Sequence, residues 1–360
     1  MQLTEAPGET KGPQSTRKQA IVERWKRRAI TIPAAFLVFL ALVACFPVLF
    51  PVVVVWDIST RAQFARTRAL LFAAFHAFCE SMGLLAAGAL WLFSGVWLGV
   101  NKDWFLSANY ALQRVWGTAL ANAAIELFRI RVEVEQHYIF GERPVLVFIR
   151  HSSYADTLLP VLLISRPYGA RLRYILKYPL LWDPCLDVVG NRLPNHFVRH
   201  ATGETAAELS RVASLAHNLG PDEGVLLYPE GTRFTEQKRA RLMQRCIQRG
   251  DDAAWNRVQR LKYVLPPRLN GALALLDANE GADAVFVAHT GLENAVTQSA
   301  LLQGGLIGAE VRVRMWGVPF EQIPKTKQER IAWLQAQWEQ VDAFVAENLS
   351  ADNPGERQNA

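Results

Sequence analysis

The sequence has few cysteines, and none of them forms a motif. Its 360 residues contain four, Cys45, Cys79, Cys185 and Cys246, which lie far apart and include no Cys-x-x-Cys pair. A disulfide framework or a zinc ribbon needs closely spaced pairs, so neither is expected. Widely spaced cysteines of this kind are typical of small, reduced, apolar residues in a reducing compartment.

Charge is absent from one long stretch, since no ionisable acid or base occurs between Ile30 and Trp56. About 20 helical residues cross a hydrocarbon core of about 30 Å, so this run is long enough to span a membrane. A second apolar run extends from Ala69 to Val100 and is interrupted only by His76 and Glu80. Two apolar runs joined by a short polar link predict a membrane helical hairpin over residues 29–100.

Residues 1–28 are polar and rich in lysine and arginine. We expect them to form a disordered basic lead, and their charge favours a cytoplasmic amino terminus. A hairpin returns the chain to the side where it began, so the rest is expected on the cytoplasmic face, which in a bacterium is that of the inner membrane. Whether the hairpin spans the bilayer or lies in one leaflet stays open, because prolines and Glu80 interrupt it.

The sequence also lacks a nucleic-acid module. Its 39 lysines and arginines exceed its 33 acidic residues, which gives a net charge of +6. A basic surplus favours anionic partners. Without a recognisable nucleic-acid motif, lipid phosphates and coenzyme A phosphates are the expected partners, and nucleic acid is not.

From residue 101 onward, apolar strands alternate with amphipathic helices, which predicts an α/β fold with a mixed sheet flanked by helices. We assign 101–349 to a catalytic domain and 350–360 to a flexible tail. Residues 234–262 are an expected insertion, basic and helical in spacing, which either binds an anionic bilayer or packs on the domain. Predicted strands occupy 129–135, 145–149, 172–176, 225–228, 284–288 and 310–316, and predicted helices occupy 104–128, 157–164, 205–218 and 328–348.

Two polar turns each follow a buried strand, where α/β folds expose reactive groups. In the first, His151 is followed after four residues by Asp156. Asp156 is expected to bond one ring nitrogen, so that the other can act as a base. In the second, Glu230, Gly231, Thr232 and Arg233 bring a carboxylate, a flexible backbone, a hydroxyl and a guanidinium together. A guanidinium suits a phosphate monoester, so these four residues are predicted to bind substrate.

Arg199 is a further predicted phosphate ligand. It lies between His196 and His200, and these histidines raise a zinc alternative with Cys185 or Asp183. That alternative is weak because no paired ligand motif is present, so no metal site is expected.

No Gly-x-Ser-x-Gly elbow surrounds Ser152 or Ser153, so neither is expected to be an acyl carrier. They are predicted to cap the following helix or to donate to an oxyanion.

These motifs together resemble the 1-acylglycerol-3-phosphate acyltransferase family of glycerolipid acyltransferases, over roughly 144–289. The family's His-x4-Asp block matches His151 and Asp156, and its Phe-Pro-Glu-Gly-Thr-Arg block matches 228–233 with Tyr228 in place of Phe. Gly190 and 197–199 resemble its Gly-…-Phe-Ile-x-Arg block with a longer gap. Leu265-Pro266-Pro267-Arg268 with Gly271 resembles a variant of the fourth block, which leaves the acceptor open.

The resemblance implies transfer of a fatty acyl group from acyl-CoA or acyl carrier protein to the hydroxyl of 1-acylglycerol-3-phosphate. The acyl donor is then a co-substrate, and no cofactor is expected. Partners would be membrane lipids and a lysophospholipid acceptor. The alternatives are a lysophospholipid or lysocardiolipin remodelling acyltransferase or transacylase, a membrane esterase or thioesterase, and a catalytically silent membrane scaffold.

Overall fold

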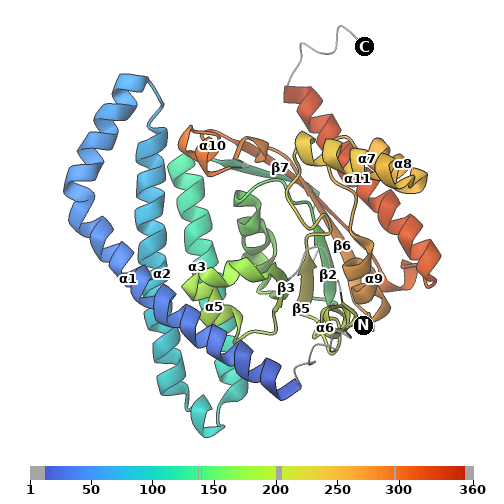
Figure 1. Cartoon of the computed structure of the whole chain (residues 1–360), viewed down its shortest axis with the longest axis horizontal. Coiled ribbons are helices and arrows are strands. Elements are labelled where there is room, and N and C mark those ends of the chain that lie inside the picture. The colour runs from blue at the N-terminus through green and yellow to red at the C-terminus, as the bar shows by residue number, and fades with distance from the viewer. Residues whose placement is uncertain (1–12, 137, 139, 200–204, 296, 353–360) are drawn as a thin grey trace, which may run out of the picture.

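The computed structural model describes residues 13–136, 138, 140–199, 205–295 and 297–352. Three long helices open the chain, followed by an α/β domain (Figure 1). The long helices are α1 Pro13–Thr60, α2 Ala65–Ser94 and α3 Lys102–Phe128, with the short turn η1 Val96–Leu98 between the last two.

One sheet of seven strands, in the order β1-β7-β6-β2-β5-β3-β4, forms the centre of the α/β domain. All neighbouring strands are parallel except β6 and β7, so the sheet is mixed, as predicted. The strands are β1 Arg131–Gln136, β2 Val145–Ile149, β3 Arg171–Lys177, β4 His196–Val198, β5 Glu223–Leu227, β6 Asp283–His289 and β7 Glu310–Val318. The helices and turns between them are η2 Ala155–Leu158, η3 Val161–Ser165, α4 Arg166–Tyr168, η4 Tyr178–Trp182, α5 Pro184–Gly190, α6 Ala206–Ser214, α7 Glu236–Arg249, α8 Asp252–Arg260, α9 Leu269–Asp277, η5 Glu293–Ala295, α10 Gln298–Leu302, η6 Phe320–Gln322 and α11 Lys327–Asp352.

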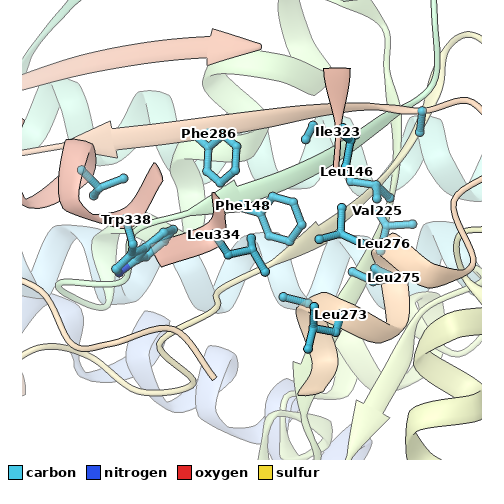
Figure 2. Close-up of a cluster of buried hydrophobic side chains, with 14 of the residues drawn as sticks. Leu146, Phe148, Val225, Leu273, Leu275, Leu276, Phe286, Ile323, Leu334 and Trp338 are labelled. Carbon is cyan, nitrogen blue, oxygen red and sulfur yellow. The ribbon is translucent and has the colours of Figure 1, made fainter. Parts of the chain in front are cut away.

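The central strands are buried on both faces, which explains their continuous apolar runs. Leu146 and Phe148 of β2 pack on one face with residues of α9 and α11. Figure 2 shows Phe148 and Phe286 next to Leu334 and Leu276 in this layer. The alternate residues of β2 face α3 and the turns η2 and η3. Two helical layers therefore hold the sheet and fix its strand ends.

Residues 13–28 differ from the disordered lead expected from their composition, because they form the first turns of α1. Arg27 and Arg28 both bind the buried carboxylate of Asp187 in α5, at 2.7 and 3.0 Å. These buried ion pairs fix the helix on the α/β domain, and the interaction could not be read from a basic run alone. The predicted tail from 350 begins inside α11, and residues 353–360 lie outside the described part of the chain.

The basic insertion forms two helices, α7 and α8, rather than one. Their apolar faces pack inward, with Cys246 and Val258 buried. Both helices lie next to α11, on the side of the sheet away from α1 and α2 (Figure 1). Of the two interpretations of this segment, the arrangement favours packing on the domain over binding a bilayer.

Candidate active site

The polar turns singled out in the sequence meet at one edge of the sheet. Strands β2, β5 and β3 are mutually parallel neighbours, so their carboxyl ends lie together. His151 follows β2, the turn 228–233 follows β5, and Lys177 ends β3. Parallel sheets place reactive groups at this edge because the chain leaves each strand there in a loop.

His151 and Asp156 are in hydrogen-bonding contact, as expected from their spacing. Nδ1 of His151 lies 3.0 and 3.2 Å from the two carboxylate oxygens of Asp156. The carboxylate is fully buried and also accepts the backbone N–H groups of Ser152 at 2.6 Å and Ser153 at 2.8 Å. Three donors on one carboxylate fix its position, and with it the orientation of the imidazole. The second ring nitrogen, Nε2, is left to serve as an acceptor.

The two serines have different surroundings. The hydroxyl of Ser153 accepts the N–H of Ala155 at 3.0 Å, although the N-cap residue of η2 is Tyr154, whose side chain forms no capping bond. The hydroxyl of Ser152 is buried, and it has no hydrogen-bond partner among the described residues. Because Asp156 takes the backbone amides of both serines, those amides are committed to the carboxylate rather than to an oxyanion.

Glu230 lies beneath the site, which differs from the substrate-binding role expected for it. Its side chain is buried, and its two oxygens accept the N–H of His151 at 2.9 Å and of Leu265 at 3.0 Å. Burial raises the pKa of Glu230 to about 7, against the lowering effect of these two hydrogen bonds. The carboxylate therefore joins the loop after β2 to the loop before α9. The sequence missed this role because the Leu265 contact spans 35 residues.

Gly231 and Thr232 shape the turn after β5. Gly231 has a φ of +65°, and a Cβ there would lie 2.8 Å from Nε of Arg268. Only glycine combines this backbone conformation with so close an approach. The hydroxyl of Thr232 accepts a hydrogen bond from Nζ of Lys238 at 2.9 Å, and the same ammonium group donates to the carbonyl of Arg233 at 2.8 Å. Two more cations are thus held beside the predicted ligands.

The cations gather around His151. The guanidinium of Arg233 stacks on the ring of Tyr154, with 3.5 Å between its central carbon and the ring centroid. Burial first, and then the charges of Arg233, Lys238 and Arg268, lower the pKa of Lys177. Mutual repulsion of this kind is relieved when an anion binds, which fits a phosphate site.

Arg199 lies at the rim of the site and is about half exposed. Its guanidinium stacks on Tyr178 at 4.4 Å and donates to the carboxylate of Glu23 in α1 at 3.0 Å. Sequence reasoning found Arg199 but missed Lys177 and the role of Arg268. Lys177 follows the predicted strand 172–176 directly, so the strand-end rule that found His151 could have found it.

A groove of about 290 Å³ runs from His151 between β3, η4 and α6. Its polar lining includes Lys177, Arg199 and Arg268. Its walls are otherwise largely apolar, formed by Ile175, Leu176, Pro179, Leu180, Val198, Leu209, Val212 and Leu227. An imidazole at one end of an apolar groove with cations around it can bind an anionic amphiphile next to a base.

A second histidine supports the site from below. His289 ends β6 and is fully buried, and its Nε2–H donates to the carbonyl of Arg150 at 2.9 Å. Burial lowers the pKa of His289, so the neutral ring lies under Asp156, with Nε2 3.9 Å from its carboxylate. The guanidinium of Arg150 is also buried and donates to the carbonyl of His289 and to Glu293, both at 2.5 Å.

Tyr228 occupies the position of the aromatic residue in the resembling motif. Its ring centroid lies 4.7 Å from that of His151, and its hydroxyl donates to the backbone carbonyl of Asp156 at 3.4 Å. The tyrosine thus packs against the imidazole and is anchored to the loop that carries the carboxylate.

Comparison with known proteins agrees with this geometry. A family model described as Acyltransferase matches residues 129–263, which include both polar turns. Over these residues the chain is similar to that family. Over 125 residues this chain is 33% identical to human (Homo sapiens) 1-acyl-sn-glycerol-3-phosphate acyltransferase delta, which covers 34% of this chain and 31% of that protein.

A second kind of relative has a longer alignment with this chain. Mouse (Mus musculus) lysocardiolipin acyltransferase 1 is 23% identical over 250 residues, 68% of this chain and 64% of that protein. The chain therefore spans about a third of the length of the first relatives and just under two thirds of the mouse protein.

A solved structure, the 1-acyl-sn-glycerophosphate acyltransferase PlsC from Thermotoga maritima, has a TM-score of 0.42 and 14% identity, covering 74% of this chain and 97% of that one. At this level the similarity determines neither the fold nor the activity of this chain.

Proposed function

We propose that this protein transfers a fatty acyl group from acyl-CoA or acyl carrier protein to the free hydroxyl of 1-acylglycerol-3-phosphate, giving phosphatidic acid. The observation that carries the proposal is the imidazole of His151, bonded to the buried Asp156 and placed at the end of an apolar groove with cations around it. The family of residues 129–263 and the name of the human relative support the same reaction class.

In this mechanism, Nε2 of His151 takes the proton of the acceptor hydroxyl, whose oxygen attacks the carbonyl carbon of the thioester. The carbon–sulfur bond breaks, and the thiol leaves with the proton that the imidazolium returns. Asp156 holds the ring in the Nδ1–H tautomer and stabilises the imidazolium. Lys177, Arg199, Arg233 and Arg268 bind the acceptor phosphate, and the apolar groove holds an acyl chain. A thioester is already activated, so no protein nucleophile is required.

A second acceptor, lysocardiolipin, is favoured by one observation. The relative named for that lipid aligns with 68% of this chain, whereas the relative named for 1-acylglycerol-3-phosphate aligns with 34%. Both acceptors offer a hydroxyl near a phosphate, so the same imidazole and cations serve either. The choice between them depends on how many phosphates the cations hold.

The membrane hairpin is proposed to lie along the surface of the bilayer rather than to cross it. Both helices are apolar and long enough to span. However, α2 contacts the α/β domain at two separate places, at its first residue through Gly304 beside Ala65 and again beyond its middle through Cys185 beside Gly83. These contacts are 18 residues apart, about 27 Å along a helix, which is close to the full thickness of a hydrocarbon core. A spanning α2 would bring the α/β domain into lipid.

The outer face of α1 is the side that meets lipid in this arrangement. Leu37, Leu40, Val43, Val48 and Val55 are all more than half exposed there. Trp91 near the end of α2, Trp97 in η1 and Trp104 in α3 are about half exposed and suit the interface between water and lipid. The basic residues before Ile30 favour the cytoplasmic side for the domain.

The proposed activity is tested with the full chain purified in detergent, radiolabelled acyl-CoA and a panel of lysophosphatidate, lysocardiolipin, lysophosphatidylcholine and monoacylglycerol. We expect phosphate-monoester acceptors to be used best, and Asp156→Asn to lower turnover by about 10²-fold or more, because Asn cannot stabilise the imidazolium. Release of free fatty acid without acceptor would favour a thioesterase. If Asp156→Asn kept wild-type turnover, the proposed role of the His151–Asp156 pair would be wrong.

A further inference from the structure

Three metal-ligating side chains meet outside the groove, where α2 contacts α5. His76 and Glu80 lie one turn apart on the same face of α2, and Asp183 directly precedes α5. One imidazole nitrogen and one oxygen from each carboxylate lie within 4.8 Å of one another. A four-residue spacing on a helix with a third ligand from another element is a common way to hold a metal ion.

Glu80 is buried without the partners that a carboxylate needs. Its side chain is only 4% exposed, and its Oε1 has no hydrogen-bond partner among the described residues. Its other oxygen accepts the N–H of Cys185 at 3.2 Å. In the described part of the chain, neither Glu80 nor Asp183 forms an ion pair with lysine or arginine. A buried carboxylate without such a partner is costly, so the pair has to be neutralised by a proton or by a bound cation.

Glu80 and Asp183 therefore form a close pair of acidic groups, and such a pair either shares a proton or takes up a cation between its members.

We propose that His76, Glu80 and Asp183 bind a zinc ion. An imidazole nitrogen with two carboxylates suits zinc, whereas magnesium and calcium prefer oxygen ligands alone. Ligand atoms around tetrahedral zinc lie roughly 3.3 Å apart, so the three groups must close by about 1.5 Å on binding. His76 is half-buried, and its ring lies beside those of Phe72 and Trp116, so it would shift against these two rings. Water fills the fourth position.

The ion links α2 of the membrane hairpin to the segment that forms one wall of the groove. Asp183 follows η4 directly, and Pro179 and Leu180 of η4 line the groove. Gly83, less than one turn beyond Glu80, allows this close packing, because a Cβ there would lie 2.5 Å from Sγ of Cys185. The zinc site lies outside the groove and does not contact the acceptor lipid, so its test is separate from that of the proposed function.

The test uses the full chain in detergent, stripped with EDTA, exchanged into chelator-free buffer and titrated with zinc chloride. Metal content after desalting is read by mass spectrometry, and stability by thermal unfolding. We expect one zinc per chain and a higher unfolding temperature with zinc, because a ligand of the folded state stabilises it. His76→Asn and Glu80→Gln should each weaken binding by about 100-fold or more and abolish the thermal shift.

His217→Asn is the matched control, because Nδ1 of His217 bonds the carboxylate of Glu280 at 2.7 Å in an exposed pair that has no third ligand among the described residues. It should leave zinc content unchanged. The proposal is overturned if the wild-type chain holds no zinc after titration to 100-fold excess and unfolds at the same temperature in zinc and in EDTA. Glu80 and Asp183 would then share a proton instead. Should His76→Asn fail to fold, the isosteric Glu80→Gln decides: full zinc content in that folded variant also overturns it.

Discussion

The floor and the rim of the groove are built in different ways. The floor consists of His151, Asp156 and Glu230, and its two carboxylates are buried and accept backbone amides. The rim includes Arg199, whose guanidinium is about half exposed and is held by one exposed glutamate and one tyrosine ring. The floor is therefore fixed by many buried hydrogen bonds, and the rim by a few weak ones.

This difference assigns different tasks to the two regions. Proton transfer requires the base to be held within a fraction of an ångström of its working geometry, which buried bonds provide. Binding a lipid phosphate requires charge but tolerates movement, and a solvent-exposed ion pair contributes only about 0–1 kcal/mol. Changes in the floor should therefore alter turnover, and changes in the rim should alter the apparent affinity for acceptor.

The largest effect is expected for His151→Ala. Removal of the general base should lower kcat by about 10²–10⁴-fold, while the KM for lysophosphatidate changes little because the cations remain. Steady-state kinetics with the purified variant measure both constants. His217→Ala, a histidine paired with Glu280 outside the groove, is the control and should keep wild-type kcat. If His151→Ala raised KM by the same factor by which it lowered kcat, the division of turnover to the floor and acceptor affinity to the rim would be wrong.

A smaller effect, on both stability and turnover, is expected for Glu230→Gln. The amide nitrogen of Gln would face one of the two backbone N–H groups that Glu230 now binds, which costs about 1–3 kcal/mol of unfolding free energy. Chemical denaturation measures this loss. Asp342→Asn is the control, because Asp342 accepts the backbone amides of Lys262, Tyr263 and Val264 in the same loop but not that of His151. At similar stability loss, only Glu230→Gln should lower kcat.

The stability difference should also depend on pH. Burial raises the pKa of Glu230 in the folded state to about 7, above its ordinary value of 4.5. The folded state then binds more protons than the unfolded state between these values, so this group's contribution to stability is complete below pH 4.5 and is lost as pH rises through about 7. The margin between wild type and Glu230→Gln should therefore shrink from pH 4.5 to 7. A margin that grows over that range would contradict the buried carboxylate.

The floor was the more predictable region from sequence. His151 and Asp156 are five residues apart and follow a buried strand, so local geometry alone brings them together. Strands β2, β5, β6 and β7 were also predicted from continuous or alternating apolar residues. The role of Glu230 was not predictable in this way, because its second partner, Leu265, comes from a distant loop.

The rim and the hairpin were less predictable because their contacts span most of the chain. Arg199 and Glu23 are 176 residues apart, and Arg27 and Asp187 are 160 apart. The basic amino-terminal run is typical of disorder by composition, and only the fold shows that Asp187 is the buried acid that binds it. Likewise, His76 and Glu80 read as interruptions of an apolar helix, and only the fold brings Asp183 to them.

The smallest effect is expected for Glu23→Gln, at the contact where the amino-terminal helix meets the rim. The carboxylate of Glu23 binds the guanidinium of Arg199, so in the proposed mechanism it competes with the acceptor phosphate for that group. Its removal should lower the KM for lysophosphatidate by about 2–5-fold at low salt, with unchanged kcat, since an exposed pair is worth about 0–1 kcal/mol. The gain should fade at high salt because such charges are screened. Glu310→Gln is the matched control. Glu310 pairs with Arg131 at the same distance of 3.0 Å, and its side chain is about half exposed like that of Glu23, but the pair lies away from the groove. Identical shifts for both variants would mean that net charge, rather than the rim, sets acceptor affinity.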